Sequence, residues 1–200
     1  MRYLYKTLVT LPFIYPTYCF TQPQTQTAIF AGGCFWCMEQ PFDRLDGVTS
    51  TTTGYTAGRM IDPTYEDVSE GETGHTEAVK ITFNLEVISY SELLNVFWRN
   101  IDPYAVDEQF CDYGSQYRTG IYYFNNIQET TAKQSLQNLK QTRPAAPQIA
   151  TEILPATVFY PAEGYHQDYY QNNPIFYKII RFTCGRDRRL EELWGNRAGN

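Results

Sequence analysis

Residues 27–45 read TAIFAGGCFWCMEQPFDRL, and this stretch contains a strand, a glycine turn and the start of a helix. Residues 27–31 are apolar and β-capable, and Gly32-Gly33 interrupts them. After the turn, apolar side chains recur at helical spacing over residues 34–45, at Phe35, Met38, Phe42 and Leu45. The pattern predicts a strand–turn–helix unit with Cys34 at the start of the helix.

Cys34 stands where a thiolate is expected to be stabilised. A helix N-terminus presents unpaired N–H groups and the positive end of its dipole, and two preceding glycines let the backbone approach closely. The thiolate is the nucleophilic form of cysteine, and Phe35 and Trp36 could form a wall for a small apolar group. We therefore interpret Cys34 as a nucleophile. The alternative is a buried cysteine beside ordinary core aromatics.

Outward from this unit, strand and helix patterns alternate irregularly. Residues 75–84 place Glu77 on the same face as Val79, Ile81 and Phe83, so this carboxyl lies on the apolar side of a strand. Strands are also expected over 48–55, 120–124 and 151–160. Helices are expected after the Ser89 capping box, and over 126–143, 165–171 and 187–194. This order predicts an α+β or two-layer α/β domain spanning residues 27–200.

The charge pattern argues against a nucleic-acid partner. The chain has 200 residues and a net charge of −6. The one basic cluster, Arg186, Arg188 and Arg189, has acidic neighbours and is expected to be the solvated start of a helix.

The first twenty residues differ from the rest of the chain. Arg2 and Lys6 precede an uncharged apolar run over residues 7–20, which is typical of a secretory signal peptide. We expect a signal at 1–20, a polar linker at 21–26 and no membrane span in the mature chain, because the run is short and contains prolines. The expected location is periplasmic or secreted, or cytoplasmic if the signal does not work. Cys19 leaves lipidation open.

Four cysteines remain beyond the leader: Cys34, Cys37, Cys111 and Cys184. An even number in an exported protein is compatible with two structural disulfides. A domain of this length does not need them, and Cys-x-x-Cys at a strand–helix junction indicates redox chemistry.

Several motifs together resemble one family, the A-type peptide methionine sulfoxide reductases. They occur in the family's order over roughly residues 28–195, and they are Gly32-Gly33-Cys34-Phe35-Trp36-Cys37, Gly54-Tyr55-Thr56-Ala57-Gly58, Pro63-Thr64-Tyr65, Gly74-His75-Thr76-Glu77-Ala78-Val79, Phe97-Trp98, Asp112-Tyr113-Gly114-Ser115-Gln116-Tyr117-Arg118 and Tyr165-His166-Gln167-Asp168-Tyr169. The resemblance implies a two-layer α/β sandwich with a mixed sheet, a ferredoxin-like core and a largely irregular C-terminal segment.

The resemblance also implies a reaction and the roles of its residues. Cys34 would attack the sulfur of methionine S-sulfoxide, free or in proteins, while Glu77 donates a proton to the oxygen. A carboxyl on an apolar face is expected to have a raised pKa, which suits an acid. Tyr65 and Tyr117 match positions that bind the oxygen. The remaining matches are Phe35 and Trp36 around the methyl group, and Asp112 and His166, which position the substrate.

Recycling is the step in which the sequence departs from the family pattern. Attack leaves a sulfenic acid on Cys34, which a second thiol converts to a disulfide. Cys37 stands where many members have glycine, and Cys184-Gly185 replaces a glycine-rich tail with two recycling cysteines. We favour Cys184 slightly over Cys37 as the resolving thiol, with Cys111 third. A dithiol such as thioredoxin would reopen the disulfide, with no metal or bound cofactor, in an enzyme expected to be a monomer.

Two other functions are compatible with parts of the sequence. Cys34-x-x-Cys37 is also the motif of general thiol–disulfide oxidoreductases, although Glu77 would then have no clear task. A non-enzymatic exported module, with cysteines paired or bound to metal, is the second. Only one close pair of possible ligands supports a zinc site.

Overall fold

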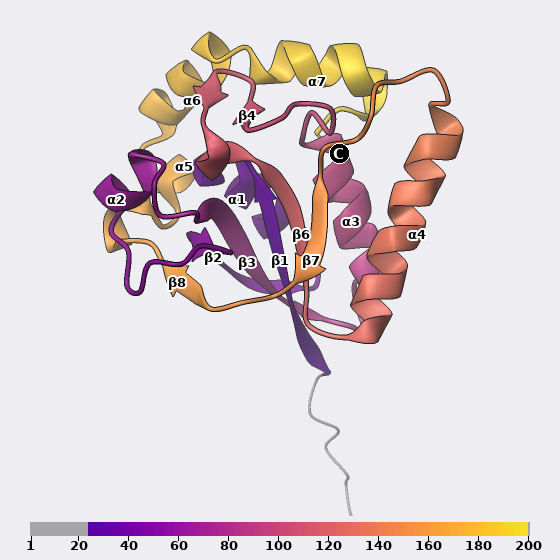
Figure 1. The fold of residues 1–200 in the computed structure, drawn as a ribbon, viewed down its shortest axis with the longest axis horizontal. Helices are drawn as coiled ribbons and strands as arrows, with labels where there is room; N and C mark the ends of the chain where they lie inside the picture. The colour runs from indigo at the N-terminus through magenta and orange to yellow at the C-terminus, as the bar shows by residue number, and fades with distance from the viewer. Residues whose placement is uncertain (1–23, 200) are drawn as a thin grey trace, which may run out of the picture.

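A six-stranded mixed sheet runs through the middle of the protein, in the order β7-β6-β1-β3-β2-β8 (Figure 1). The computed structural model describes residues 24–199. The strands of this sheet are β1 (Thr25–Gly32), β2 (Val48–Thr56), β3 (Thr76–Asn84), β6 (Thr119–Tyr123), β7 (Glu152–Pro155) and β8 (Phe159–Pro161). A separate ribbon pairs β4 (Glu108–Gln109) with β5 (Asp112–Tyr113).

The predicted ferredoxin-like core is confirmed in the four central strands, β6-β1-β3-β2, which pair antiparallel. A helix follows β1 and another follows β3, giving the order βαββαβ. The long helix α4 crosses from β6 to β7, which pairs parallel to β6 and makes the sheet mixed. The helices are α1 (Phe35–Asp43), α2 (Tyr65–Ser69), α3 (Tyr90–Arg99), α4 (Asn126–Thr142), α5 (Tyr169–Asn172), α6 (Pro174–Thr183) and α7 (Arg186–Trp194).

Aromatic packing between β1 and the helices fixes the unit that holds Cys34. Phe30 of β1 is fully buried, and its ring centroid lies 5.0 Å from that of Phe97 on α3 and 5.5 Å from that of Phe42 on α1. Burial of one such ring stabilises the fold by about 2–3 kcal/mol. The predicted capping box at Ser89 is present, because its side chain accepts from the Glu92 N–H. These contacts hold α1 and α3 against β1.

The prediction of one strand over 151–160 is wrong. Residues 152–155 form β7 at one edge of the sheet, and 159–161 form β8 at the other. Pro155 has no N–H with which to continue a ladder, and the chain crosses the end of the sheet between the two strands (Figure 1). The helix expected over 165–171 is likewise interrupted at Asp168, whose φ of 52° is left-handed.

The C-terminal segment is more helical than predicted. Helix α6 was not expected, while α7 and its end at Gly195 match the prediction. Both pack along the edge of the molecule above α1 and the sheet (Figure 1). At the other end of the chain, β1 begins at Thr25, two residues inside the predicted linker. The predicted signal peptide at 1–20 lies outside the described residues.

No helix within residues 24–199 is both long enough and apolar enough to cross a membrane.

Candidate active site

Cys34 is the N-cap residue of α1, directly after the glycine turn. Its carbonyl accepts from the N–H of Cys37 at 3.0 Å. Gly33 has φ +79°, and a Cβ there would lie 2.5 Å from the Cβ of Gln109, so this turn requires glycine. Gln109 is itself fixed, because its amide exchanges hydrogen bonds with the backbone of Asp102. The sequence-predicted strand–turn–helix unit is thus confirmed.

The thiols of Cys34 and Cys37 share a hydrogen bond. This bond lowers the pKa of Cys37 to about 6, assisted by the charge of Arg186. The same bond, together with burial, raises the pKa of Cys34. The two thiols therefore share a single proton near neutral pH, and the charge of Arg186 stabilises the negative charge of the pair. Because the remaining proton lies between the two sulfurs, its transfer to Cys37 produces the Cys34 thiolate.

Arg186 supplies positive charge beneath this pair, and the sequence interpretation of it was wrong. It was expected at a solvated helix start, yet it is 1% exposed. Its Nη2 donates to the carbonyls of Asn100 at 2.7 Å and Gly32 at 3.2 Å. Its guanidinium also lies 4.4 Å from the ring centroid of Phe110. These contacts hold a cation at the end of β1, and nothing in the local sequence separates it from the exposed Arg188.

Glu77 lies on β3 and is 2% exposed, in agreement with the predicted apolar face. Its Oε2 accepts from the Phe35 N–H at 2.9 Å, which connects it to the residue after Cys34. Burial raises the pKa of Glu77 to about 8, and the Phe35 hydrogen bond only partly opposes this shift. The carboxyl is therefore mostly protonated at neutral pH and is able to donate a proton.

Tyr65 and Tyr117 both lie near Glu77 and Cys34. Tyr65 begins α2, where the Thr64–Asp67 capping box and the donation of its N–H to Glu163 at 2.8 Å hold the backbone. Burial, followed by the charges of Glu77 and Cys34, raises the pKa of Tyr65 to about 12. Burial and the charge of Glu77 also raise the pKa of Tyr117. Both hydroxyls therefore keep their protons and serve as hydrogen-bond donors.

An aromatic wall flanks the cysteine. The Trp36 ring stacks on Tyr169, with centroids 3.7 Å apart and planes 7° from parallel. The Trp36 Nε1–H donates to His166 Nδ1 at 3.1 Å. His166 is 1% exposed, and burial lowers its pKa, so it is a neutral acceptor that orients Trp36. Tyr169 belongs to one of the shared motifs, but its role in the wall depends on its stacking on Trp36, which the sequence does not predict.

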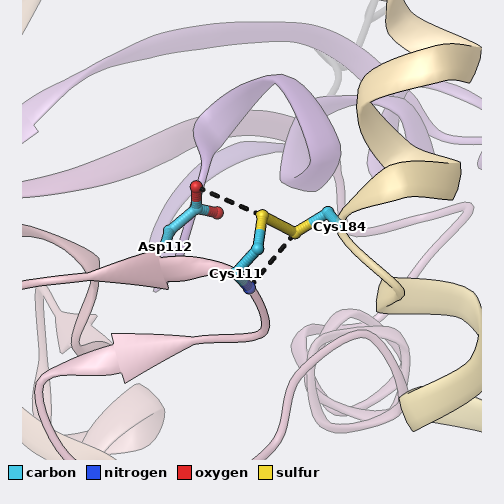
Figure 2. Close-up of side chains that lie close together, drawn as sticks. All are labelled: Cys111, Asp112 and Cys184. Atoms are coloured by element: carbon cyan, nitrogen blue, oxygen red, sulfur yellow. Dashed lines mark hydrogen bonds between the residues drawn. A yellow bond between two sulfur atoms is a disulfide. The ribbon is translucent and has the colours of Figure 1, made fainter.

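Asp112 connects the two cysteine pairs. A hydrogen bond from the Cys34 backbone partly opposes the rise that burial causes in the pKa of Asp112. On its other side, Oδ1 lies 3.7 Å from Cys111 Sγ. Cys111 and Cys184 form a disulfide that joins the loop before β5 to the end of α6 (Figure 2). Of the four predicted cysteines, Cys34 and Cys37 are the free thiols.

The site residues thus converge although they come from five parts of the chain. Cys34, Trp36, Tyr65, Asp112 and Tyr117 are partly exposed, and Phe35, Glu77 and His166 are buried behind them. A cavity of about 520 Å³ between α3 and α4 shares none of these residues, and its lining contains no thiol or carboxyl.

Comparison with known proteins decides the family. The family model described as peptide methionine sulfoxide reductase matches residues 26–198. This chain belongs to that family. It is 46% identical over 170 residues to peptide methionine sulfoxide reductase MsrA of Bacillus subtilis, covering 85% of this chain and 96% of the relative. It is 43% identical to MsrA 2 of Rhizobium meliloti, covering 99% of this chain and 96% of the relative.

Solved structures of this reductase family share the fold. Methionine sulfoxide reductase A of Corynebacterium diphtheriae has a TM-score of 0.73 and 33% identity, with 77% of each chain covered. Reduced Mxr1 of Saccharomyces cerevisiae has a TM-score of 0.71 and 30% identity, covering 76% of this chain and 87% of Mxr1. Mxr1 has also been solved in complex with Trx2.

Proposed function

We propose that this reductase converts methionine S-sulfoxide, free or within proteins, to methionine, with Cys34 as the nucleophile. The observation that carries the proposal is the connection of Cys34 to a buried acid. Glu77 accepts from the N–H next to Cys34 and holds its own proton near neutral pH. Family membership agrees with this chemistry.

The reaction needs a nucleophile at sulfur and an acid at oxygen. The Cys34 thiolate bonds to the sulfoxide sulfur while the oxygen takes the Glu77 proton. Transfer of the resulting hydroxyl to Cys34 releases methionine and leaves a sulfenic acid. The two electrons come from the Cys34 sulfur, the proton of the thiol pair stays on Cys37, and Glu77 regains its proton from solvent before the next turnover.

Tyr65 and Tyr117 stabilise the oxygen as charge develops on it. Their hydroxyls remain protonated, so they donate hydrogen bonds that strengthen in the transition state. Phe35 and Trp36 receive the methyl group. Because the Trp36 ring is fixed, the pocket is chiral. Placing the methyl group on this wall and the oxygen beside Glu77 selects one epimer at sulfur, and the resemblance to the A-type reductases assigns it as S.

We now favour Cys37 over Cys184 as the resolving thiol. Cys37 already shares a hydrogen bond with Cys34, whereas Cys184 is bonded to Cys111. Condensation of Cys37 with the sulfenic acid releases water and forms a Cys34–Cys37 disulfide. Cys37 is 4% exposed, while Cys111 is exposed. The Cys111–Cys184 pair, once reduced, would therefore pass electrons inward from an external dithiol.

Thioredoxin is the dithiol that we propose, in keeping with the Mxr1–Trx2 complex. We also propose that residues 1–20 direct export and that the mature enzyme acts as a monomer. Fractionation of cells that express the full chain, and light scattering of the purified protein, test these two points separately.

An epimer-resolved reduction assay with a dithiol donor tests the function. Wild type is expected to consume S-sulfoxide and to spare the R epimer, and Cys34→Ser is expected to be inactive. Equal turnover of both epimers contradicts the proposal. Insulin reduction without sulfoxide reduction would favour the general thiol–disulfide oxidoreductase instead. Mass spectrometry after one turnover identifies the resolving thiol, and a Cys34–Cys184 bond would restore the order predicted from sequence.

A further inference from the structure

Three carboxylates from α1 and from the turn before α5 lie close together. Glu39 and Asp43 lie one helical turn apart on α1, and Asp168 lies in the turn before α5. One oxygen from each lies within 4.8 Å of the other two. None of the three joins an ion pair within residues 24–199. Their mutual repulsion therefore has to be compensated by something other than a basic side chain.

The buried member of the group has an oxygen without a partner. Glu39 is 1% exposed, and its Oε2 has no hydrogen-bond partner among the described residues. A buried carboxylate oxygen is costly unless a donor, a proton or a cation satisfies it. Glu39 thus brings a buried, unsatisfied oxygen to the group of three carboxylates.

The other two carboxylates are accessible and oriented. Asp43 and Asp168 line a polar cavity of about 390 Å³ at the surface, together with the hydroxyl side chains of residues 49–51. Thr51 Oγ1 donates to Asp43 Oδ1 at 2.6 Å, and the Tyr170 hydroxyl donates to Oδ2 at 2.9 Å. Such outer hydrogen bonds orient metal ligands and leave each oxygen with a further lone pair.

We propose that Glu39, Asp43 and Asp168 bind a hard divalent cation, and that Ca²⁺ is the ion that fits best. All the available donors are oxygens, which excludes a preference for soft metals. Ca²⁺ accepts irregular geometry at roughly 2.3–2.6 Å from each oxygen, so ligands on opposite sides of one ion lie roughly 4.6–5.2 Å apart. The three carboxylate oxygens lie within 4.8 Å of one another, so their separations do not exceed what the ligands of one Ca²⁺ can span.

A cation here would restrain the wall of the reductase site without taking part in the reaction. Asp168 directly precedes Tyr169, the residue stacked on Trp36. A metal that joins Asp168 to α1 would fix the segment that carries Tyr169. The binding claim does not depend on the proposed reaction, because it is measured on resting protein.

Terbium luminescence tests the site directly on the full chain, after dialysis against a chelator. Tb³⁺ replaces Ca²⁺ at oxygen sites, and the Tyr170 ring beside Asp43 would sensitise its emission. We expect sensitised emission that Ca²⁺ displaces, with a calorimetric Kd for Ca²⁺ on the order of 10⁻⁴ M. Asp168→Asn should weaken binding about tenfold or more, and so should Glu39→Gln.

Asp107→Asn is the matched control. Asp107 is exposed and has φ 50°, close to the 52° of Asp168, so both substitutions remove one charge from a left-handed aspartate. Unchanged binding in this variant, with loss in Asp168→Asn, supports the proposal. No calorimetric heat at millimolar Ca²⁺, or equal affinity in all variants, overturns it and assigns a proton to Glu39.

Discussion

Replacing Glu77 with glutamine is expected to lower the reductase activity. The same substitution is expected to remove a loss of folding stability that the wild type shows as the pH rises. Glutamine keeps an oxygen to accept from the Phe35 N–H but has no proton to give. Removing a general acid typically costs about 10²–10⁴-fold in rate. Wild-type kcat is expected to fall as the pH rises through about 8, where Glu77 ionises. The variant should lack that fall.

The stability effect follows from the same shift. Burial raises the pKa of Glu77 from 4.5 to about 8. Between these values the folded state holds a proton that the unfolded state has lost, so wild-type stability decreases as the pH rises and levels off above 8. Between pH 5 and pH 8 the accumulated loss is about 3 kcal/mol. Glu77→Gln should not show this loss.

Urea denaturation of reduced protein at pH 5 and pH 8, beside steady-state kinetics at both, measures the two effects. Any constant cost of burying the amide cancels in the comparison between pH values. Glu152→Gln is the control, since that carboxylate is partly exposed beside Arg118. The reasoning is refuted if Glu77→Gln retains wild-type activity at neutral pH, or if the two proteins lose stability in parallel.

Three further substitutions test the site. Gly33→Ala should cost roughly 2 kcal/mol in urea denaturation, because φ is +79° and the new Cβ would meet Gln109; a neutral effect would contradict the close approach. His166→Phe removes the acceptor for the Trp36 N–H, so KM should rise about tenfold while kcat changes little. A tenfold fall in kcat as well would show that His166 does more than position Trp36. Arg186→Met should raise the pKa of Cys37 from about 6, observed as thiolate absorbance against pH, while Arg186→Lys shifts it less; an unchanged titration would remove Arg186 from the account of the thiol pair.

The local sequence pattern was enough to predict a residue's position where its environment is set by its immediate neighbours. The alternation over 75–84 placed Glu77 on an apolar face, and its burial and raised pKa follow from that position. The glycine turn placed Cys34 at the start of α1 for the same reason. The shared motifs extended this to Tyr65, Tyr117 and the ferredoxin-like order of strands, because related sequences keep the same fold.

Local pattern failed where a residue's partner is far away in the chain. Residues 151–160 carry one strand pattern, but Pro155 and the distance between the sheet edges divide it into β7 and β8. Arg186 and Arg188 look alike in sequence, and only the carbonyls of Gly32 and Asn100 distinguish the buried one. The pairing of Cys111 with Cys184 spans 73 residues, so spacing alone could not select it.

The sequence by itself placed Cys34 after the glycine turn and Glu77 on an apolar strand face, since periodicity and turn chemistry act over a few residues, and the family resemblance implied their roles. The tertiary structure decided that Arg186 and Cys37 lie beside Cys34 and that Cys184 is paired with Cys111. Those properties depend on Coulomb and hydrogen-bond contacts that fall off within several ångströms. Folding alone brings α7, β1 and α1 that close together.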